Sequence, residues 1–322
     1  MQLGIVGINH KSSTLPLREA VAKAFQKACE TKEGVLLSTC NRTEFYFCAR
    51  SLVTTQMEIL SLLREEMGES FEHALYSYFG HDCFNHLGKV VSGLDSAIFG
   101  ESDIQRQVKL AYKKARERGN LSHEIHYLFQ KGLKIGKELR SSFLMAKKGM
   151  ELPYIIQRIL EKHGRPAQES RVLFVGNSAI NRKLISFFQF RGAEKLTLCT
   201  RMKKGEFPKI SVENWDILEN WDRYDVVICG TRHEEHILQK STRFLRETLL
   251  FDLSVPRNID PELGKHPGLK LYDIDRIGKS EPERDGEREI ALCENAVEKA
   301  VRKQMKLFKE RKQAKWRYAV SL

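Results

Sequence analysis

The sequence has little of what membrane-spanning, secreted or zinc-binding proteins need. No stretch approaches the roughly 20 consecutive apolar residues that span a bilayer, and the opening Met-Gln-Leu-Gly-Ile-Val-Gly has no basic segment ahead of an apolar run. The seven cysteines include no C-x-x-C pair, and their odd number favours reduced thiols over disulfides or a structural zinc site. We therefore expect a cytoplasmic protein with no membrane association and no metal.

Acidic residues are outnumbered by basic ones. The 54 lysines and arginines against 42 aspartates and glutamates give a net charge of +12. Basic side chains gain free energy when they displace counterions from phosphates, so the excess favours a polyanionic partner. A solvated surface that is merely basic is the alternative, and composition alone leaves both open.

The length of 322 residues suggests two or three domains. At the N-terminus, apolar patterning predicts a strand over 3–8, a helix ending near 28, and strands over 35–39 and 45–49. Residues 40–44 then form a polar connection that presents Cys40 at the end of a strand. Helical patterning dominates from about 54 to 163, so we expect an α+β catalytic domain over 1–145.

The second half of the sequence has a different hydrophobic pattern. Short apolar runs alternate with helical segments and predict a Rossmann-like parallel sheet, in an α/β domain over 146–283. The predicted strands are 172–175, 196–199, 226–229, 249–253 and 269–272. Beyond 284, apolar residues at intervals of seven and four predict one long C-terminal helix up to 322.

Four segments of the chain carry a family resemblance, in the order that the family has them. They are Ser-Thr-Cys-Asn-Arg-Thr-Glu-Phe-Tyr at 38–46, the opening at 7–19, Ser-Gly-Leu-Asp-Ser at 92–96 with its continuation to 109, and 252–261. The chain thereby resembles the glutamyl-tRNA reductase family over about residues 5–275. The resemblance implies NADPH-dependent reduction of glutamyl-tRNA to glutamate-1-semialdehyde, the first step of tetrapyrrole synthesis.

The resemblance implies that Cys40 is the nucleophile. Thiolate is a strong nucleophile, and a thioester accepts hydride more readily than an oxygen ester, which lets a two-electron reduction stop at the aldehyde. We expect Cys40 to attack the ester, release the tRNA and hold a glutamyl thioester. From the residues alone, Cys40 would instead be a small buried hydrophobe.

Further site residues follow from the same resemblance. The family carries a histidine important for activity where Ser96 stands here, and His86 lies ten positions earlier. We expect His86 to protonate the departing ribose oxygen, because histidine titrates near neutral pH; a structural histidine on a helix is the alternative. The planar fork of Arg42 suits the free carboxylate of the glutamyl group, with a surface salt bridge as the alternative. The other expected substrate-binding residues are Thr39, Asn41, Ser96, Glu101, Ser102, Asp103 and Gln107.

Two features of this substrate set are open. Thr39 and Asn41 could equally form a turn. The family usually has glutamine where Asp103 stands and glycine where Arg106 stands, so local substrate contacts could differ.

A turn for the cofactor is expected after the first strand of the second domain. The predicted cofactor-binding residues are Gly176, Asn177, Ser178, Ala179, Ile180 and Asn181. Ser178 stands where the second glycine of a dinucleotide turn belongs, although the helix that follows can still offer N–H groups to phosphate. After the next strand, Thr200 and Arg201, with Lys203 and Lys204, favour the 2′-phosphate of NADPH; a solvated basic loop is the alternative.

The expected macromolecular partners are glutamyl-tRNA(Glu), a second copy of the chain through the C-terminal helix, and glutamate-1-semialdehyde aminomutase. Family members usually continue into a helical dimerisation domain, of which this sequence has little, so a monomer is also open. Two basic clusters favour tRNA contact. They are Lys109, Lys113, Lys114, Arg116 and Arg118 in one, and Arg302, Lys303, Lys306, Lys309, Arg311, Lys312, Lys315 and Arg317 in the other.

Two rival functions remain from the sequence. One is another NADP-dependent dehydrogenase of the shikimate-dehydrogenase type, which would leave the Cys40 segment unexplained. The other is a non-catalytic tRNA-binding regulator with a degenerate nucleotide domain, which the unusual turn at 176–181 supports.

Overall fold

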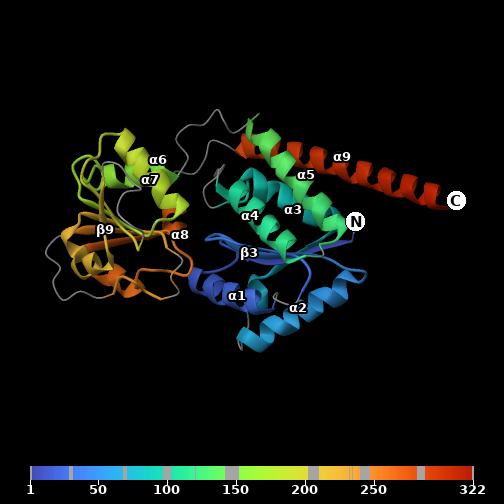
Figure 1. The fold of residues 1–322 in the computed structure, drawn as a ribbon, viewed down its shortest axis with the longest axis horizontal. Helices are drawn as coiled ribbons and strands as arrows, with labels where there is room; N and C mark the ends of the chain where they lie inside the picture. Colours follow the sequence, from blue (N-terminus) through green and yellow to red (C-terminus); the bar gives the residue numbers. More distant parts are fainter. Residues whose placement is uncertain are drawn as a thin grey trace. The chain divides into compact units, whose positions relative to one another are not determined.

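The computed structural model forms two compact units (Figure 1), which are described separately. Unit 1 contains Met1–Met150 and Glu283–Leu322, and unit 2 contains Glu151–Pro282. The residues that the structure describes are 2–28, 32–67, 71–96, 103–119, 121–141, 152–201, 210–231, 233, 235–239, 247–280 and 287–320.

Unit 1 is built on an antiparallel sheet with the strand order β2-β3-β1-β4. Its strands are β1 (Leu3–Asn9), β2 (Val35–Ser38), β3 (Arg42–Cys48) and β4 (Tyr76–Phe79). The inner strands β1 and β3 have seven residues each and are buried almost throughout. Ser38 pairs with Thr43, so β2 and β3 form a hairpin that carries Cys40 in its short connection.

Helices cover both faces of this sheet (Figure 1). On one face, α1 (Leu15–Ala28) and α2 (Leu52–Met67) bury apolar side chains against Phe45 and Phe47 of β3. On the other face lie α3 (Gly80–Ser92), α4 (Asp103–Arg118) and α5 (His123–Leu139), and a short 3-10 turn η1 (Glu72–Ala74) precedes β4. Helix α3 ends at Gly93, whose φ of 78° is left-handed backbone that glycine adopts without a steric penalty.

The predicted long C-terminal helix is confirmed as α9 (Glu287–Val320). It has 34 residues, which corresponds to about 51 Å. Its apolar side chains at Val297, Val301 and Phe308 join the core formed by α3 and α5. Gly88 of α3 permits close approach, because a Cβ there would lie 2.7 Å from Val297. None of the helices among the described residues is long and apolar enough to cross a membrane.

Unit 2 confirms the predicted Rossmann-like architecture. Its six strands are all parallel, in the order β10-β9-β8-β5-β6-β7. They are β5 (Val172–Val175), β6 (Leu196–Cys199), β7 (Ser211–Glu213), β8 (Val226–Cys229), β9 (Thr248–Asp252) and β10 (Leu269–Asp273). The helical elements are α6 (Leu152–Lys162), α7 (Ala179–Phe190), η3 (Trp215–Arg223), η4 (Pro261–Lys265) and α8 (Ile274–Lys279).

The central strand of unit 2 shows why these strands read as apolar runs. Phe174 of β5 contacts Phe188 of α7, whereas its neighbours Leu173 and Val175 join the cluster around Trp221 of η3. Because both faces of the strand are covered, every side chain in it is buried and no polar alternation is possible.

Three details differ from the sequence-based prediction. Strand β3 begins at Arg42, so the predicted loop over 40–44 is wrong for its last three residues. A strand whose charged side chains point into a buried polar cluster lacks the apolar alternation that identifies a strand. Strands β4 and β7 were not expected, since four and three residues are too few for a periodic signal.

Candidate functional site

The hairpin connection around Cys40 is held by its own hydrogen bonds. The backbone N–H of Thr39 donates to the carbonyl of Arg42 at 2.8 Å, and the Thr39 hydroxyl accepts from the N–H groups of Asn41 and Arg42, both at 3.2 Å. Just beyond the end of β1, the N–H of His10 donates to the carbonyl of Asn41 at 2.9 Å. Cys40 is half-buried at the tip of this turn. Thr39 therefore forms the turn that was its alternative reading, and its substrate role stays a prediction.

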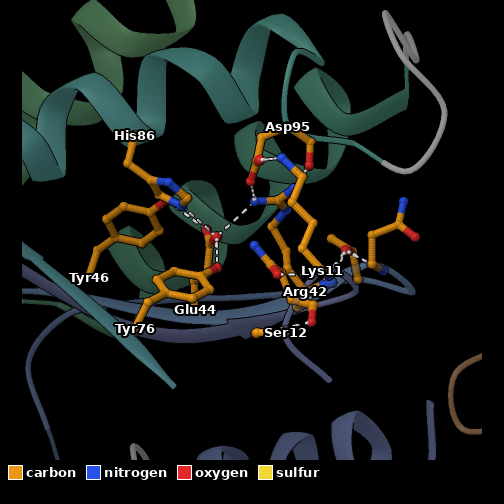
Figure 2. Close-up of polar contacts among 11 residues, drawn as sticks. Lys11, Ser12, Arg42, Glu44, Tyr46, Tyr76, His86 and Asp95 are labelled. Carbon is orange, nitrogen blue, oxygen red and sulfur yellow. Dashed lines mark hydrogen bonds and ion pairs between the residues drawn. The ribbon is translucent and has the colours of Figure 1, made fainter. Parts of the chain in front are cut away.

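Directly after the turn, β3 places two charged residues on the face toward α3, where they form a buried cluster (Figure 2). Arg42 Nη1 lies 2.9 Å from Glu44 Oε1 and 2.8 Å from Asp95 Oδ2, and Nη2 donates to the carbonyl of Asp95. Lys11 binds the other oxygen of Asp95. Both Arg42 and Glu44 are fully buried, so Arg42 is not the surface salt bridge considered as its alternative.

Glu44 collects donors from three elements (Figure 2). Its Oε1 accepts from Tyr76 of β4 at 2.6 Å and contacts Nε2 of His86 of α3 at 2.7 Å, and its Oε2 accepts from Tyr46 at 2.7 Å. Burial would raise the pKa of Glu44, but Arg42 and His86 lower it well below its ordinary value. An ionised carboxylate only accepts hydrogen bonds, so His86 must donate from Nε2. Nδ1 of His86 is then the ring atom able to exchange a proton in a reaction.

The same cluster perturbs its other members. Burial would lower the pKa of Arg42, yet Glu44 beside it raises that pKa above the ordinary value. Burial would raise the pKa of Asp95, and Arg42 instead holds it below the ordinary value. Burial, reinforced by Glu44, raises the pKa of Tyr46 and Tyr76 well above the usual range. The cluster therefore keeps its charges and its phenol protons fixed across the neutral pH range.

Several buried polar atoms beside this cluster have no hydrogen-bond partner among the described residues. They are His10 Nδ1, Asn41 Oδ1, Arg42 Nε and Ser96 Oγ. Burial lowers the pKa of His10 to about 4, and Arg42 adds to the effect, so this imidazole is neutral at neutral pH. Unpaired buried polar atoms cost free energy. These four atoms thus retain unused hydrogen-bonding capacity close to the buried cluster.

The expected substrate residues of α4 contact each other. Asp103 binds Arg106 through both carboxylate oxygens, at 2.7 and 2.9 Å, and accepts from Gln107 Nε2 at 2.9 Å. The two departures from the family pattern at positions 103 and 106 thus form one ion pair. Helix α4 reaches the hairpin because Ile104 and Val108 share a core with Leu37 of β2. Glu101 and Ser102 lie outside the described residues.

The turn after β5 in unit 2 keeps the geometry of a nucleotide-binding turn despite its unusual residues. Gly176 has a φ of 93°, and a Cβ there would collide with Thr231. Ser178 begins α7 as its N-cap, accepting from the N–H of Asn181 at 3.2 Å. The amide of Asn181 donates to the carbonyls of Val175 and Gly176, at 3.0 and 2.8 Å. Asn181 therefore braces the turn where a third glycine would stand.

The first N–H groups of α7, those of Ala179 and Ile180, precede any intrahelical partner and suit a phosphate. Asn177, which directly follows Gly176 in the turn, accepts a hydrogen bond from Nε of Arg182 at 2.7 Å. At the next strand end, Thr200 is buried, with its N–H donating to the carbonyl of Glu213 at 3.0 Å, and Arg201 is exposed. The residues present thus fit a dinucleotide. Lys203 and Lys204 lie outside the described residues.

Asp252 is a buried carboxylate at the C-terminal end of β9, the edge of the sheet at which Gly176 and Thr200 also lie. It accepts from the N–H groups of Ser254, Asn258 and Ile259, at 3.1, 2.9 and 2.9 Å. Burial raises its pKa to about 6, against the opposing effect of these N–H groups. The carboxylate thereby shapes the loop of residues 253–259.

We expect Asp252→Asn to lower the free energy of unfolding of unit 2 by about 1–3 kcal/mol at pH 7, because one amide nitrogen would face a backbone N–H. The folded pKa lies above that of an unfolded aspartate, so the stabilisation is greatest below pH 4 and is lost as the pH rises through about 6. The deficit should therefore be larger at pH 4.5 than at pH 7. Unfolding followed by tryptophan fluorescence measures it, and exposed Asp216→Asn is the control. An equal deficit at both pH values would contradict the raised pKa.

Sequence reasoning offered Glu44 as a polar contact for the substrate, but missed other members of the buried cluster as site residues, namely His10, Lys11, Tyr46, Tyr76 and Asp95. One signal was available. Arg42, Glu44 and Tyr46 recur at every second position, which places them on one face of a strand. Tyr76 and Asp95 gave no local signal, because they reach Glu44 and Arg42 only through sheet pairing and the end of α3.

Comparison with known proteins matches both halves of the chain. Residues 6–143 match the family "Glutamyl-tRNAGlu reductase, N-terminal domain", and residues 158–279 match "Shikimate / quinate 5-dehydrogenase". The chain is 33% identical to the glutamyl-tRNA reductase of Chlamydia caviae over 272 residues, which are 80% of this chain and 78% of that protein. It is 29% identical to the glutamyl-tRNA reductase of Akkermansia muciniphila over 328 residues, which are 94% of this chain and 96% of that protein.

A solved structure gives the same architecture. The glutamyl-tRNA reductase from Methanopyrus kandleri superposes with a TM-score of 0.52 over 98% of this chain and 82% of that one. At 20% sequence identity this likeness concerns the fold alone. It supports an α+β domain followed by a Rossmann-like domain and a C-terminal helix.

Proposed function

This chain belongs to the glutamyl-tRNA reductase family, and on that premise we propose that it reduces glutamyl-tRNA(Glu) to glutamate-1-semialdehyde with NADPH, in the cytoplasm, as the first step of tetrapyrrole synthesis. The observation that carries the proposal is the Cys40 turn. A half-buried thiol stands on a braced three-residue connection, beside buried polar atoms that have no partner among the described residues. Such a turn presents a nucleophile and can orient a small polar acyl group.

The covalent step takes place at Cys40. Its thiolate sulfur attacks the carbonyl carbon of the aminoacyl ester, the C–S bond forms, and the C–O bond to the terminal ribose breaks. The ribose oxygen leaves with the tRNA and takes up a proton. When bound, NADPH would supply the hydride that reduces the thioester carbonyl. The aldehyde then leaves, and Cys40 returns as a thiolate.

His86 and Arg42 serve this step in different ways. Because the Nε2–H group of His86 donates to Glu44, we assign Nδ1 of His86 as the atom that transfers a proton to the departing ribose oxygen. Two nitrogens of Arg42 are held by Glu44 and Asp95, and its Nε has no partner among the described residues. We assign Arg42 Nε, Asn41 Oδ1 and Ser96 Oγ to binding of the glutamyl group. Asp103 and Gln107, in the first two turns of α4, are assigned to the same substrate pocket.

NADPH would be held in unit 2, which we assign as the cofactor domain. The turn at Gly176 and the N-terminus of α7 suit its diphosphate, and Arg201 suits its 2′-phosphate. The catalytic domain is then unit 1. Handover of the aldehyde to glutamate-1-semialdehyde aminomutase and dimerisation through α9 remain part of the same proposal.

The basic face of α9 is proposed to bind the tRNA backbone. Replacing Lys303, Lys306 and Lys309, all exposed, by glutamine should weaken tRNA binding and lower the slope of log K against log salt by roughly 2–3, since each lost phosphate contact removes about 0.7–0.9. Binding measured at several salt concentrations tests this. Glutamine at Lys23, Lys27 and Lys32, near α1 on the other face of the sheet, is the matched control. Equal losses in both triple variants would remove α9 from the binding surface.

The enzyme proposal is tested with the unmodified chain, charged tRNA(Glu) and NADPH. We expect NADPH oxidation that requires the aminoacyl group and yields one glutamate-1-semialdehyde per NADPH. Oxidation of shikimate with NADP⁺ would support the dehydrogenase rival instead. Binding of charged tRNA with neither adduct nor aldehyde would support a regulator.

A further inference from the structure

The guanidinium of Arg201 lies on the indole of Trp215. Its Cζ is 4.4 Å from the ring centroid, well inside the range of a cation–π contact. Arg201 follows β6, and Trp215 follows β7 as the first residue of η3. These two strands are parallel neighbours, so their following segments meet at one edge of the sheet.

The pair is tied to the sheet by backbone bonds. The N–H of Thr200 donates to the carbonyl of Glu213 at 3.0 Å, which sets the spacing between the two segments. The Trp215 ring is also 5.5 Å from the ring of His233, which lies beyond the end of β8. Trp215 therefore occupies a defined place between the ends of β6 and β8.

Among the described residues, the positive charge of Arg201 is not neutralised by an ion pair. No carboxylate pairs with it there, and the side chain is exposed. A free arginine would sample many rotamers, and ordering it on a ligand would cost side-chain entropy. Stacked on an indole, it keeps its N–H groups at the edge of the plane, where they remain available to a phosphate.

We propose that Trp215 is a specificity-determining residue, which holds Arg201 in position to bind the 2′-phosphate of the dinucleotide. In parallel nucleotide-binding sheets the residue after the second strand contacts the 2′ position of the ribose. Trp215 acts through Arg201 and thereby selects NADPH over NADH. The proposal rests on the proposed function, because it assumes that unit 2 binds this cofactor.

Two fragments isolate the contribution of the 2′-phosphate. Adenosine 2′,5′-bisphosphate and adenosine 5′-monophosphate differ only in that group, and calorimetric titration of the full chain measures both. Trp215→Leu should weaken binding of the bisphosphate about two- to fivefold, as loss of an exposed cation–π contact implies. Binding of the monophosphate should be unchanged. Trp215→Phe should retain most of the preference. Arg201→Leu should weaken the bisphosphate about tenfold or more.

Other outcomes would overturn the proposal. Equal weakening of both fragments in Trp215→Leu would make the indole a platform for adenine, and no change in either would leave it without a role. Arg201→Lys gives a second route if Trp215→Leu does not fold, since lysine lacks the planar stacking surface and should also lose preference for the bisphosphate. If the unmodified chain binds neither fragment nor NADPH, the cofactor assignment itself fails, which is a different result from an unchanged ratio.

Discussion

Cys40→Ala should form no covalent adduct with glutamyl-tRNA labelled in its amino acid, whereas the unmodified chain should retain the label in a thiol-sensitive bond when NADPH is absent. The sulfur is the atom that forms the acyl bond, so no neighbouring group replaces it. Turnover with NADPH should fall by about 10³-fold or more, as expected when a nucleophile is removed. Trapping followed by gel analysis measures the adduct, and aldehyde release measures turnover.

The chain offers a matched control for this experiment. Cys48 ends β3, the strand that follows the Cys40 turn, and it is also half-buried. Burial raises the pKa of the Cys48 thiol, which makes it a poorer nucleophile at neutral pH. Cys48→Ala should therefore label and turn over like the unmodified chain. Persistent labelling of Cys40→Ala, or no labelling of the unmodified chain, would sink the assignment of Cys40.

Glu44→Gln should lower the free energy of unfolding of unit 1 by about 3–5 kcal/mol. The carboxylate is fully buried and is contacted by Arg42, Tyr46, Tyr76 and His86, all donors at 2.6–2.9 Å. An amide would turn its NH₂ group toward some of these donors and leave the buried Arg42 with only Asp95 to balance its charge. Faster hydrogen exchange of peptides from β1 and β3 measures the loss.

The pH dependence adds a second test of Glu44. Its folded pKa lies well below the ordinary value of 4.5, so the stabilisation is present above about pH 4.5 and is lost as the pH falls toward the folded value. Glu44→Gln should flatten this acid loss. The control is Glu58→Gln, whose exposed pair with Lys32 should contribute less than about 1 kcal/mol. Similar effects of the two substitutions would contradict a structural role for the buried cluster.

The same substitution bears on chemistry. The side-chain amide introduced by Glu44→Gln could accept from His86 or donate to it, so Nε2 of the imidazole would no longer be obliged to donate. A fall in labelling rate with a changed pH profile, in protein that remains folded, would show that Glu44 orients His86. Unchanged labelling kinetics would restrict Glu44 to stability.

Local patterns in the sequence were sufficient for much of the architecture. The runs of β5, β6, β8 and β9 were found because every residue in these strands is buried, which leaves few polar positions. The edge strand β10 has exposed Lys270 and was found from the apolar residues on either side of it. Helix α9 was found because its apolar residues recur on one face without proline or glycine. Cys40 was predicted to be the nucleophile because it lies in a motif of nine residues, and that role stays a prediction. Each of these signals lies within a short stretch of chain.

Only the tertiary structure decided what these residues contact. Sheet pairing brings Tyr76 to Glu44, helix packing brings His86 to Glu44 across 42 positions, and the end of α3 brings Asp95 to Arg42 across 53. Sequence periodicity reports which face of an element is buried, and carries no information on which distant side chain meets it there. The sequence by itself thus determined most strands of the parallel sheet and the long helix, and it predicted the role of Cys40, whereas the fold decided that Arg42 is held by carboxylates and that His86 donates to one.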